Sequence, residues 1–221
     1  MQEGYCAPDE NAPWAVTLPQ LRKRTLSCPD LQQRSEEELA DLVLSVFPID
    51  SDTSFCTDSM IRQFDDYDGS VCASSFTSSG SEHAYWMENF VHRLVTELTM
   101  VAEYERLHGG DDVVRSDFAV RHLVSASILI DRAKCNGLLL TELSFKRVLI
   151  AAVYVASKLL DDVPQPAHYF ALLAGISKTE LFKLESALLA LCDFDVHLSE
   201  DLFVERYAQL LGVPSLQLAQ I

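Results

Sequence analysis

Two charged residues, Lys158 and Glu185, stand within apolar helical sequence and are the residues best suited to binding chemistry. Lys158 follows the apolar run 148–156, and Glu185 lies between two leucines of a helix whose neighbouring positions are apolar. An ammonium donates to carbonyl oxygens and a carboxylate accepts from N–H groups, so together they could clamp a peptide backbone. Each such charge-assisted hydrogen bond contributes about 1.5 to 3 kcal/mol.

Three apolar residues near this pair, Leu159, Leu189 and Phe194, could form a groove for a helix of a partner protein. The residue types alone are also compatible with purely structural roles, which the spacing favours for the apolar residues. Lys158 could cap the carbonyls at the end of its own helix, where a cation is favoured by the helix dipole. Glu185 could belong to a structural ion pair, since an unpaired buried carboxylate is strongly disfavoured. The three apolar residues could be plain core.

Motifs for catalysis are missing from the sequence. It contains no GxSxG, HExxH or GxGxxG, and its six histidines include no pair at the four-residue spacing of helical metal ligands. The six cysteines are scattered without a close pair, which argues against a zinc knuckle and a disulfide framework. We therefore expect no catalytic residue, no metal site and no cofactor.

The charge balance restricts the partners further. The formal net charge of the 221 residues is −16, and acidic residues outnumber basic ones in both halves of the chain. Nucleic acids and anionic membrane surfaces attract proteins through lysine and arginine, so neither is an expected partner. The N-terminus lacks a signal-peptide pattern, and no apolar stretch reaches the roughly 20 residues of a membrane span. We expect an intracellular protein of the cytoplasm, the nucleus or both.

The chain divides into four predicted parts. Residues 1–49 form an N-terminal extension with one short helix, opened by a capping box at Ser35 and Glu38. Residues 50–84 are rich in Ser and Asp and predict a flexible linker. Residues 85–198 predict five consecutive helices, and residues 199–221 predict a C-terminal helix and tail. The third helix of the five is apolar on every side over 148–156, which is typical of the central helix of a bundle.

Three segments of this five-helix region together resemble the cyclin box: ILIDR (128–132), ASKLLDD (156–162) and LESALLALCDFDV (184–196). Within that family, HYFALLAGISKTELFKLE (168–185) is most similar to the phosphate-pathway (PHO-like, P/U-type) cyclins. The resemblance covers about residues 85–198 and implies an all-α fold with a single five-helix cyclin box. An extra N-terminal helix and a C-terminal helix would flank the box.

The resemblance also implies a partner, a cyclin-dependent protein kinase. Lys158 and Glu185 match the pair that hydrogen-bonds backbone groups of the kinase just ahead of its αC helix. Apolar positions that pack on αC itself are matched by Leu159, Leu189, Phe194 and Val196.

Two further roles follow from the resemblance. Asp131 matches an acid that cyclins pair with an arginine of the first helix of the box, and Arg93 is the candidate arginine here. We expect Asp162 to project beside the clamp with Asp161 and to pair with an arginine near the activation segment of the kinase, where a carboxylate can partly replace a phosphate. Without a partner, the two acids would form a solvated turn.

The sequence therefore predicts a non-catalytic cyclin that binds and activates a serine/threonine kinase. Helix one of the box lacks the substrate-docking pattern of cell-cycle cyclins, and whether the process is division or nutrient signalling stays open. A free-standing helical scaffold is the alternative if Lys158 and Glu185 are buried and paired only with each other. A cyclin-fold transcription factor would need a basic face, and a small enzyme would need a nucleophile and a base.

Overall fold

The structure is a computed structural model that describes residues 36–47, 49, 61–64, 80–107, 118–161 and 164–211. Within these residues the fold is all-α and contains no strand, which confirms the predicted fold class. Seven α-helices and one 3-10 helix occur in this part of the chain: α2 (Glu36–Val46), η3 (Ile61–Phe64), α3 (Gly80–Leu107), α4 (Phe118–Cys135), α5 (Phe145–Leu160), α6 (Ala167–Ala174), α7 (Lys178–Leu191) and α8 (Glu200–Leu211).

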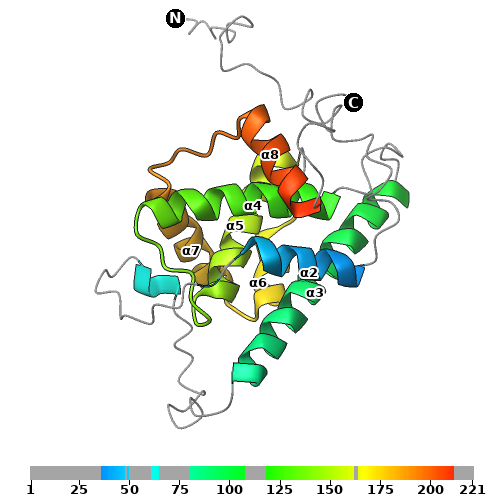
Figure 1. Cartoon of the computed structure of the whole chain (residues 1–221), viewed down its shortest axis with the longest axis horizontal. Coiled ribbons are helices and arrows are strands. Elements are labelled where there is room, and N and C mark those ends of the chain that lie inside the picture. Colours follow the sequence, from blue (N-terminus) through cyan, green and yellow to red (C-terminus); the bar gives the residue numbers. More distant parts are fainter. Residues whose placement is uncertain are drawn as a thin grey trace, which may run out of the picture.

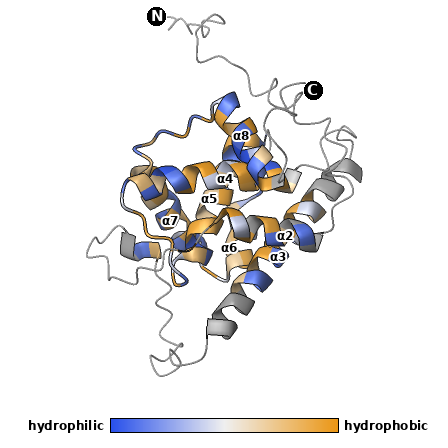
Figure 2. Cartoon of the chain, in the orientation of Figure 1, coloured by the Kyte–Doolittle hydropathy of each residue, from blue (hydrophilic) through white to orange (hydrophobic). Residues whose placement is uncertain are grey.

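The helix α5 is the centre of the bundle (Figure 1). Twelve of its 16 residues are buried, and the run from Val148 to Ala156 is buried without interruption. Because helix α5 is apolar on all sides, it needs neighbours around it. It packs against α4, α7, α6 and α3, and Figure 2 shows its residues in mainly hydrophobic colours. The prediction of a buried central helix is confirmed.

The turn between α6 and α7 sets where α7 begins. Gly175 ends α6 with a left-handed φ of 69°, and its N–H bonds back to the carbonyls of Ala171 and Leu172. The side chain of Ser177 then accepts a hydrogen bond from the N–H of Glu180 at 3.1 Å. This side-chain cap satisfies an N–H of the first turn, and it fixes the start of the helix that carries Glu185.

Two helices lie outside the five-helix unit formed by α3 to α7. Helix α2 packs against α3, α8 and α4, and helix α8 packs mainly against α4. The buried residues Phe203 and Tyr207 stack in α8 at 6.1 Å between ring centroids. The sequence predicts these two extra helices, and the structure joins both of them to the same core.

Part of the predicted linker is helical. Most of residues 50–84 lie outside the described residues, but 61–64 form η3 and the last five residues, 80–84, already belong to α3. The short helix η3 packs against α7 and α5, and Phe64 is completely buried. The prediction of a linker is wrong for these two pieces. At η3 a single aromatic side chain, Phe64, fills a site in the core although most of the predicted linker is polar.

We expect Phe64→Ala to lower the free energy of unfolding by about 3 kcal/mol, because truncating a buried Phe loses its transfer free energy and leaves a cavity. Chemical denaturation of the wild type and the variant measures the difference. A loss below about 1 kcal/mol, which is typical of surface positions, would mean that η3 is not part of the cooperative core.

Candidate protein-binding site

Helices α5 and α7 bring Lys158 and Glu185 together. The Nζ of Lys158 lies 2.6 Å from Oε1 of Glu185. The Lys158 side chain is 40% exposed and the Glu185 side chain 16% exposed. The sequence alone does not reveal this contact, which joins residues 27 positions apart. The pair is therefore an ion pair at the surface, with the ammonium accessible to another molecule.

Tyr154 is a second neighbour of the ammonium. Its ring centroid lies 4.4 Å from Nζ of Lys158, one helical turn earlier on α5. Burial lowers the pKa of Lys158, but the contacts with Glu185 and Tyr154 outweigh that effect, and the pKa lies above its usual 10.5. A raised lysine pKa keeps the cation throughout the neutral range, and its stabilising effect is lost only as pH rises above that value.

The apolar residues predicted beside the pair differ in exposure. Leu159, Leu189 and Val196 are half-buried and pack against the core. Phe194 is 70% exposed. Leu159, Leu189 and Val196 therefore contribute to the core and keep part of their surface exposed. The ring of Phe194 projects into solvent.

Phe182 is a further candidate residue that the sequence patterns above do not include. It lies three residues before Glu185 on α7, a spacing that places both on the same helix face, and it is 46% exposed. Because Leu189 follows Glu185 by four residues, the same face continues to it. A search for apolar residues at helical spacing from Glu185 would have found Phe182.

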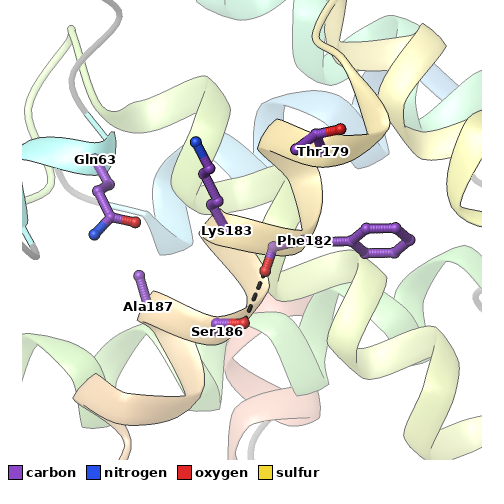
Figure 3. Close-up of a pocket in the computed structure, with 6 residues that line it drawn as sticks. All are labelled: Gln63, Thr179, Phe182, Lys183, Ser186 and Ala187. Atoms are coloured by element: carbon purple, nitrogen blue, oxygen red, sulfur yellow. Dashed lines mark hydrogen bonds between the residues drawn. The ribbon is translucent and has the colours of Figure 1, made fainter.

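An open groove of about 480 Å³ lies between η3 and α7. It is lined by Gln63, Thr179, Phe182, Lys183, Ser186 and Ala187. In Figure 3 the side chains of Gln63 and Lys183 face the same space, whereas the ring of Phe182 points away from them. The hydroxyl of Ser186 donates to the carbonyl of Phe182 at 2.9 Å.

The predicted ion pair of Arg93 and Asp131 does not form. Asp131 on α4 is paired instead with Arg206 of α8, and its side chain is 46% exposed. Arg93 is exposed on α3. The prediction is wrong because it considered only the helices of the box. Helix α8 packs against α4 and supplies the arginine.

The predictions for Asp161 and Asp162 have different outcomes in the structure. Asp161 points inward: its Oδ2 lies 3.0 Å from Nε2 of the fully buried His122, and it accepts a hydrogen bond of 2.8 Å from Ser157. Its side chain is only 10% exposed. The predictions of a solvated turn and of a projection beside the clamp are therefore wrong for Asp161. Asp162 lies outside the described residues.

We expect Asp161→Ala to lower the free energy of unfolding by about 2 kcal/mol, because it removes an acceptor from the buried His122 ring and from Ser157. Asp161→Asn keeps an oxygen acceptor of similar shape and should cost less. Thermal and chemical unfolding of the two variants measures the difference. If both variants were as stable as the wild type, the inward hydrogen bonds of Asp161 would not stabilise the fold.

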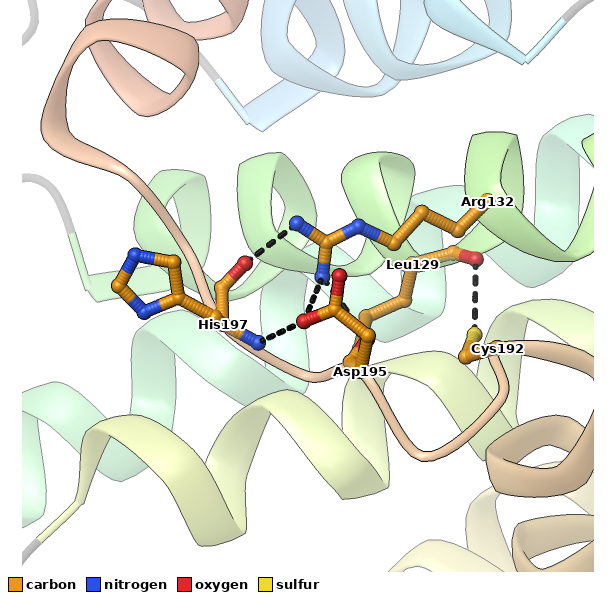
Figure 4. A network of polar contacts seen from close by, with 5 residues as sticks. All are labelled: Leu129, Arg132, Cys192, Asp195 and His197. Carbon is orange, nitrogen blue, oxygen red and sulfur yellow. Dashed lines mark hydrogen bonds and ion pairs between the residues drawn. The ribbon is translucent and has the colours of Figure 1, made fainter. Parts of the chain in front are cut away.

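The segment after α7 is tied to the end of α4 by residues that the sequence reasoning did not assign. Arg132 donates from Nη1 to the carbonyl of Asp195 at 2.8 Å and from Nη2 to the carbonyl of His197 (Figure 4). The thiol of Cys192 donates to the carbonyl of Leu129 at 3.4 Å. Burial is the main cause that raises the pKa of Cys192 to about 11, so it stays a thiol at neutral pH.

Residues 52–196 match the family model described as Cyclin, which is more than half of the chain. The chain belongs to the cyclin family. The matched region begins before the cyclin box predicted from the sequence and includes η3.

Two curated relatives are of the U and P types, as the resemblance predicted. The chain is 38% identical over 78 residues to Cyclin-U1-1 of Arabidopsis thaliana, covering 34% of this chain and 37% of that protein. It is 44% identical over 57 residues to Cyclin-P1-1 of Oryza sativa subsp. japonica, covering 26% of this chain and 22% of that protein. The chain thus spans well under half the length of these relatives. No solved structure matches it.

Among the described residues, no group of three or more His, Cys, Asp or Glu side chains could hold a metal ion. In the same part of the chain, no helix combines the length and apolar character of a membrane span. What the surface offers is an exposed ammonium, a carboxylate beside it and exposed aromatic rings.

Proposed function

We propose that this cyclin binds a cyclin-dependent serine/threonine kinase through the face formed by α5, α7 and the segment after α7, and so activates it. Family membership supports a regulatory role, in which the kinase performs the chemistry. Lys158 donates to backbone carbonyls of the kinase and Glu185 accepts from its N–H groups. The αC helix packs on Leu159, Leu189, Phe194 and Val196. Held inward, αC allows the kinase's own Lys–Glu pair and its metal-binding Asp to form.

The observation that carries this proposal is the exposure of the face. Two large aromatic side chains on or just after α7, Phe182 and Phe194, are 46% and 70% exposed. Glu185 lies on α7 between these two residues in sequence, and its ion-pair partner Lys158 on α5 is 40% exposed. Exposed aromatic residues around a charged pair are typical of the residues that dominate protein interfaces. We add Phe182 to the kinase contacts for this reason.

A free-standing scaffold is the second candidate, and one observation favours it. A scaffold would require that Lys158 and Glu185 are both buried and paired only with each other. They do pair with each other, at 2.6 Å. The Lys158 side chain is not buried, because it is 40% exposed. An ammonium that already holds its partner and still faces solvent can add acceptors, because it has three donors.

Asp162 is proposed as an additional contact with the kinase. Its carboxylate would pair with an arginine near the activation segment and lessen the need for phosphorylation there. We expect Asp162→Asn to lower the activity of a complex built with unphosphorylated kinase several-fold, and to have less effect once the segment is phosphorylated. Equal activity of wild type and variant in both complexes would remove Asp162 from the interface.

The test of the proposed function is a reconstitution. Purified cyclin-dependent kinases are each combined with the full chain, and the phosphorylation rate of a serine/threonine peptide is measured. We expect at least one kinase to co-elute with the chain and to gain at least 100-fold in rate. Co-elution without activation would favour the scaffold, and neither co-elution nor activation with any kinase would overturn the proposal.

A further inference from the structure

The segment that follows α7 has an unusual backbone. Asp193 and Phe194 are consecutive non-glycine residues with positive φ, 52° and 57°. The left-handed conformation crowds the Cβ atom of L-amino acids, so it persists only where the surroundings impose it. Phe194 is at the same time 70% exposed. Because the exposed ring of Phe194 has little packing around it, contacts to the main chain must impose the left-handed conformation.

Helix α4 and the turn after it provide two anchors, one on each side of Phe194. Before it, the Nδ2 of Asn136 donates to the carbonyl of Leu191 at 2.7 Å and lies 3.3 Å from Oδ2 of Asp193. After it, Arg132 donates to the carbonyls of Asp195 and His197. The two anchors bracket Phe194.

Within the segment, three backbone N–H groups support the same shape. The N–H of Phe194 donates to the carbonyl of Leu189 at 2.8 Å, and that of Asp195 donates to the carbonyl of Cys192 at 2.9 Å. The N–H of His197 donates to Oδ1 of Asp195 at 3.1 Å, and the same carboxylate oxygen lies 3.6 Å from Nη1 of Arg132. Figure 4 shows the guanidinium between Asp195 and His197.

A different role for Arg132 would be to neutralise the C-terminal end of its own helix, since it stands in the last turn of α4. The contacts argue against this role. The guanidinium of Arg132 donates to carbonyls 63 and 65 residues away in the chain, beyond α7. The side chain of Arg132, which is 23% exposed, therefore binds the segment after α7.

We infer that Arg132, aided by Asn136, is a positioning residue that holds segment 193–197 so that the ring of Phe194 is fixed before a kinase arrives. The inference rests on the proposed function for the identity of the partner. A ring fixed in advance loses less conformational entropy on binding, which increases affinity without any contact between Arg132 and the partner.

The first test needs no kinase. Hydrogen exchange is measured on the full chain for the amides of Phe194, Asp195 and His197. In Arg132→Gln these amides should exchange at least tenfold faster, and amides of α5 should stay within twofold of the wild type. Arg206→Gln is the matched control, because it also removes an arginine that contacts α4 but lies on α8. Unchanged exchange at all three amides in Arg132→Gln would overturn the inference.

The second test uses a kinase that binds the wild-type chain. Arg132→Gln should weaken binding at least tenfold when Phe194 is present and less than twofold in a Phe194→Ala background, since Arg132 acts through that ring. A purely structural role would give equal losses in both backgrounds and would contradict the inference. If no kinase binds the wild type, the proposed function fails, and the exchange test still decides whether Arg132 fixes the segment.

Discussion

The double variant Lys158→Ala/Glu185→Ala is expected to bind the kinase at least 100-fold more weakly than the wild type. It removes at least two charge-assisted hydrogen bonds to the kinase backbone, each contributing about 1.5 to 3 kcal/mol, and a tenfold change in affinity corresponds to about 1.4 kcal/mol. The fold should change little, because ion pairs at the surface contribute only about 0 to 1 kcal/mol to stability. Isothermal titration with the kinase and a thermal melt of the free chain measure the two effects.

The structure offers a matched control for this experiment. Glu180 is also on α7 and pairs with Arg147 of α5 at 2.5 Å, so it joins the same two helices nearer the start of α7. Glu180→Gln and Glu185→Gln make the same chemical change. We expect only Glu185→Gln to weaken kinase binding, by tenfold or more. Equal losses would mean that the general packing of α5 on α7 matters and the clamp does not.

Val153→Asp is expected to abolish cooperative folding at neutral pH. Val153 is completely buried in the central helix α5, and a carboxylate placed there has neither water nor a hydrogen-bonding partner to offset its burial. The penalty is comparable to the total stability of a domain, about 5 to 15 kcal/mol. Far-UV circular dichroism during chemical denaturation would show the loss of a cooperative transition.

Val204→Asp on α8 makes the same substitution at a half-buried position. It should lower the free energy of unfolding by only about 1 kcal/mol, because its carboxylate can reach water. A cooperative Val153→Asp variant with a stability near that of Val204→Asp would contradict the description of α5 as the centre of the core.

The fold could be predicted because local patterns and global packing agree in this chain. The uninterrupted apolar run of α5 requires a central position, and the Ser177 cap marks the start of α7 by a local hydrogen bond. Phe64 could not be placed in the same way. The apolar residues of segment 50–84 are isolated and have no periodicity, and the burial of Phe64 depends on a site formed by α7 and α5.

The site was predicted less completely for a similar reason. Residue types point to Lys158 and Glu185, and the structure brings the two side chains into contact. The partner of Asp131 depends on how α8 crosses α4, which no local pattern encodes. Likewise, Asp161 pairs inward because α4 places His122 opposite it. The positive φ of Phe194 has no signal in the sequence, because neither it nor Asp193 is a glycine.

Site-specific photocrosslinking tests our claim that the kinase sits on the face containing Phe182 and Phe194. A benzoylphenylalanine residue replaces Phe194 in one variant and Leu172 in another; these side chains are 70% and 73% exposed, and Leu172 belongs to α6. Irradiation of each variant with a kinase that co-elutes with the chain should crosslink the kinase from position 194 and not from position 172. Crosslinks from position 172 alone would place the kinase on another face and contradict the claim.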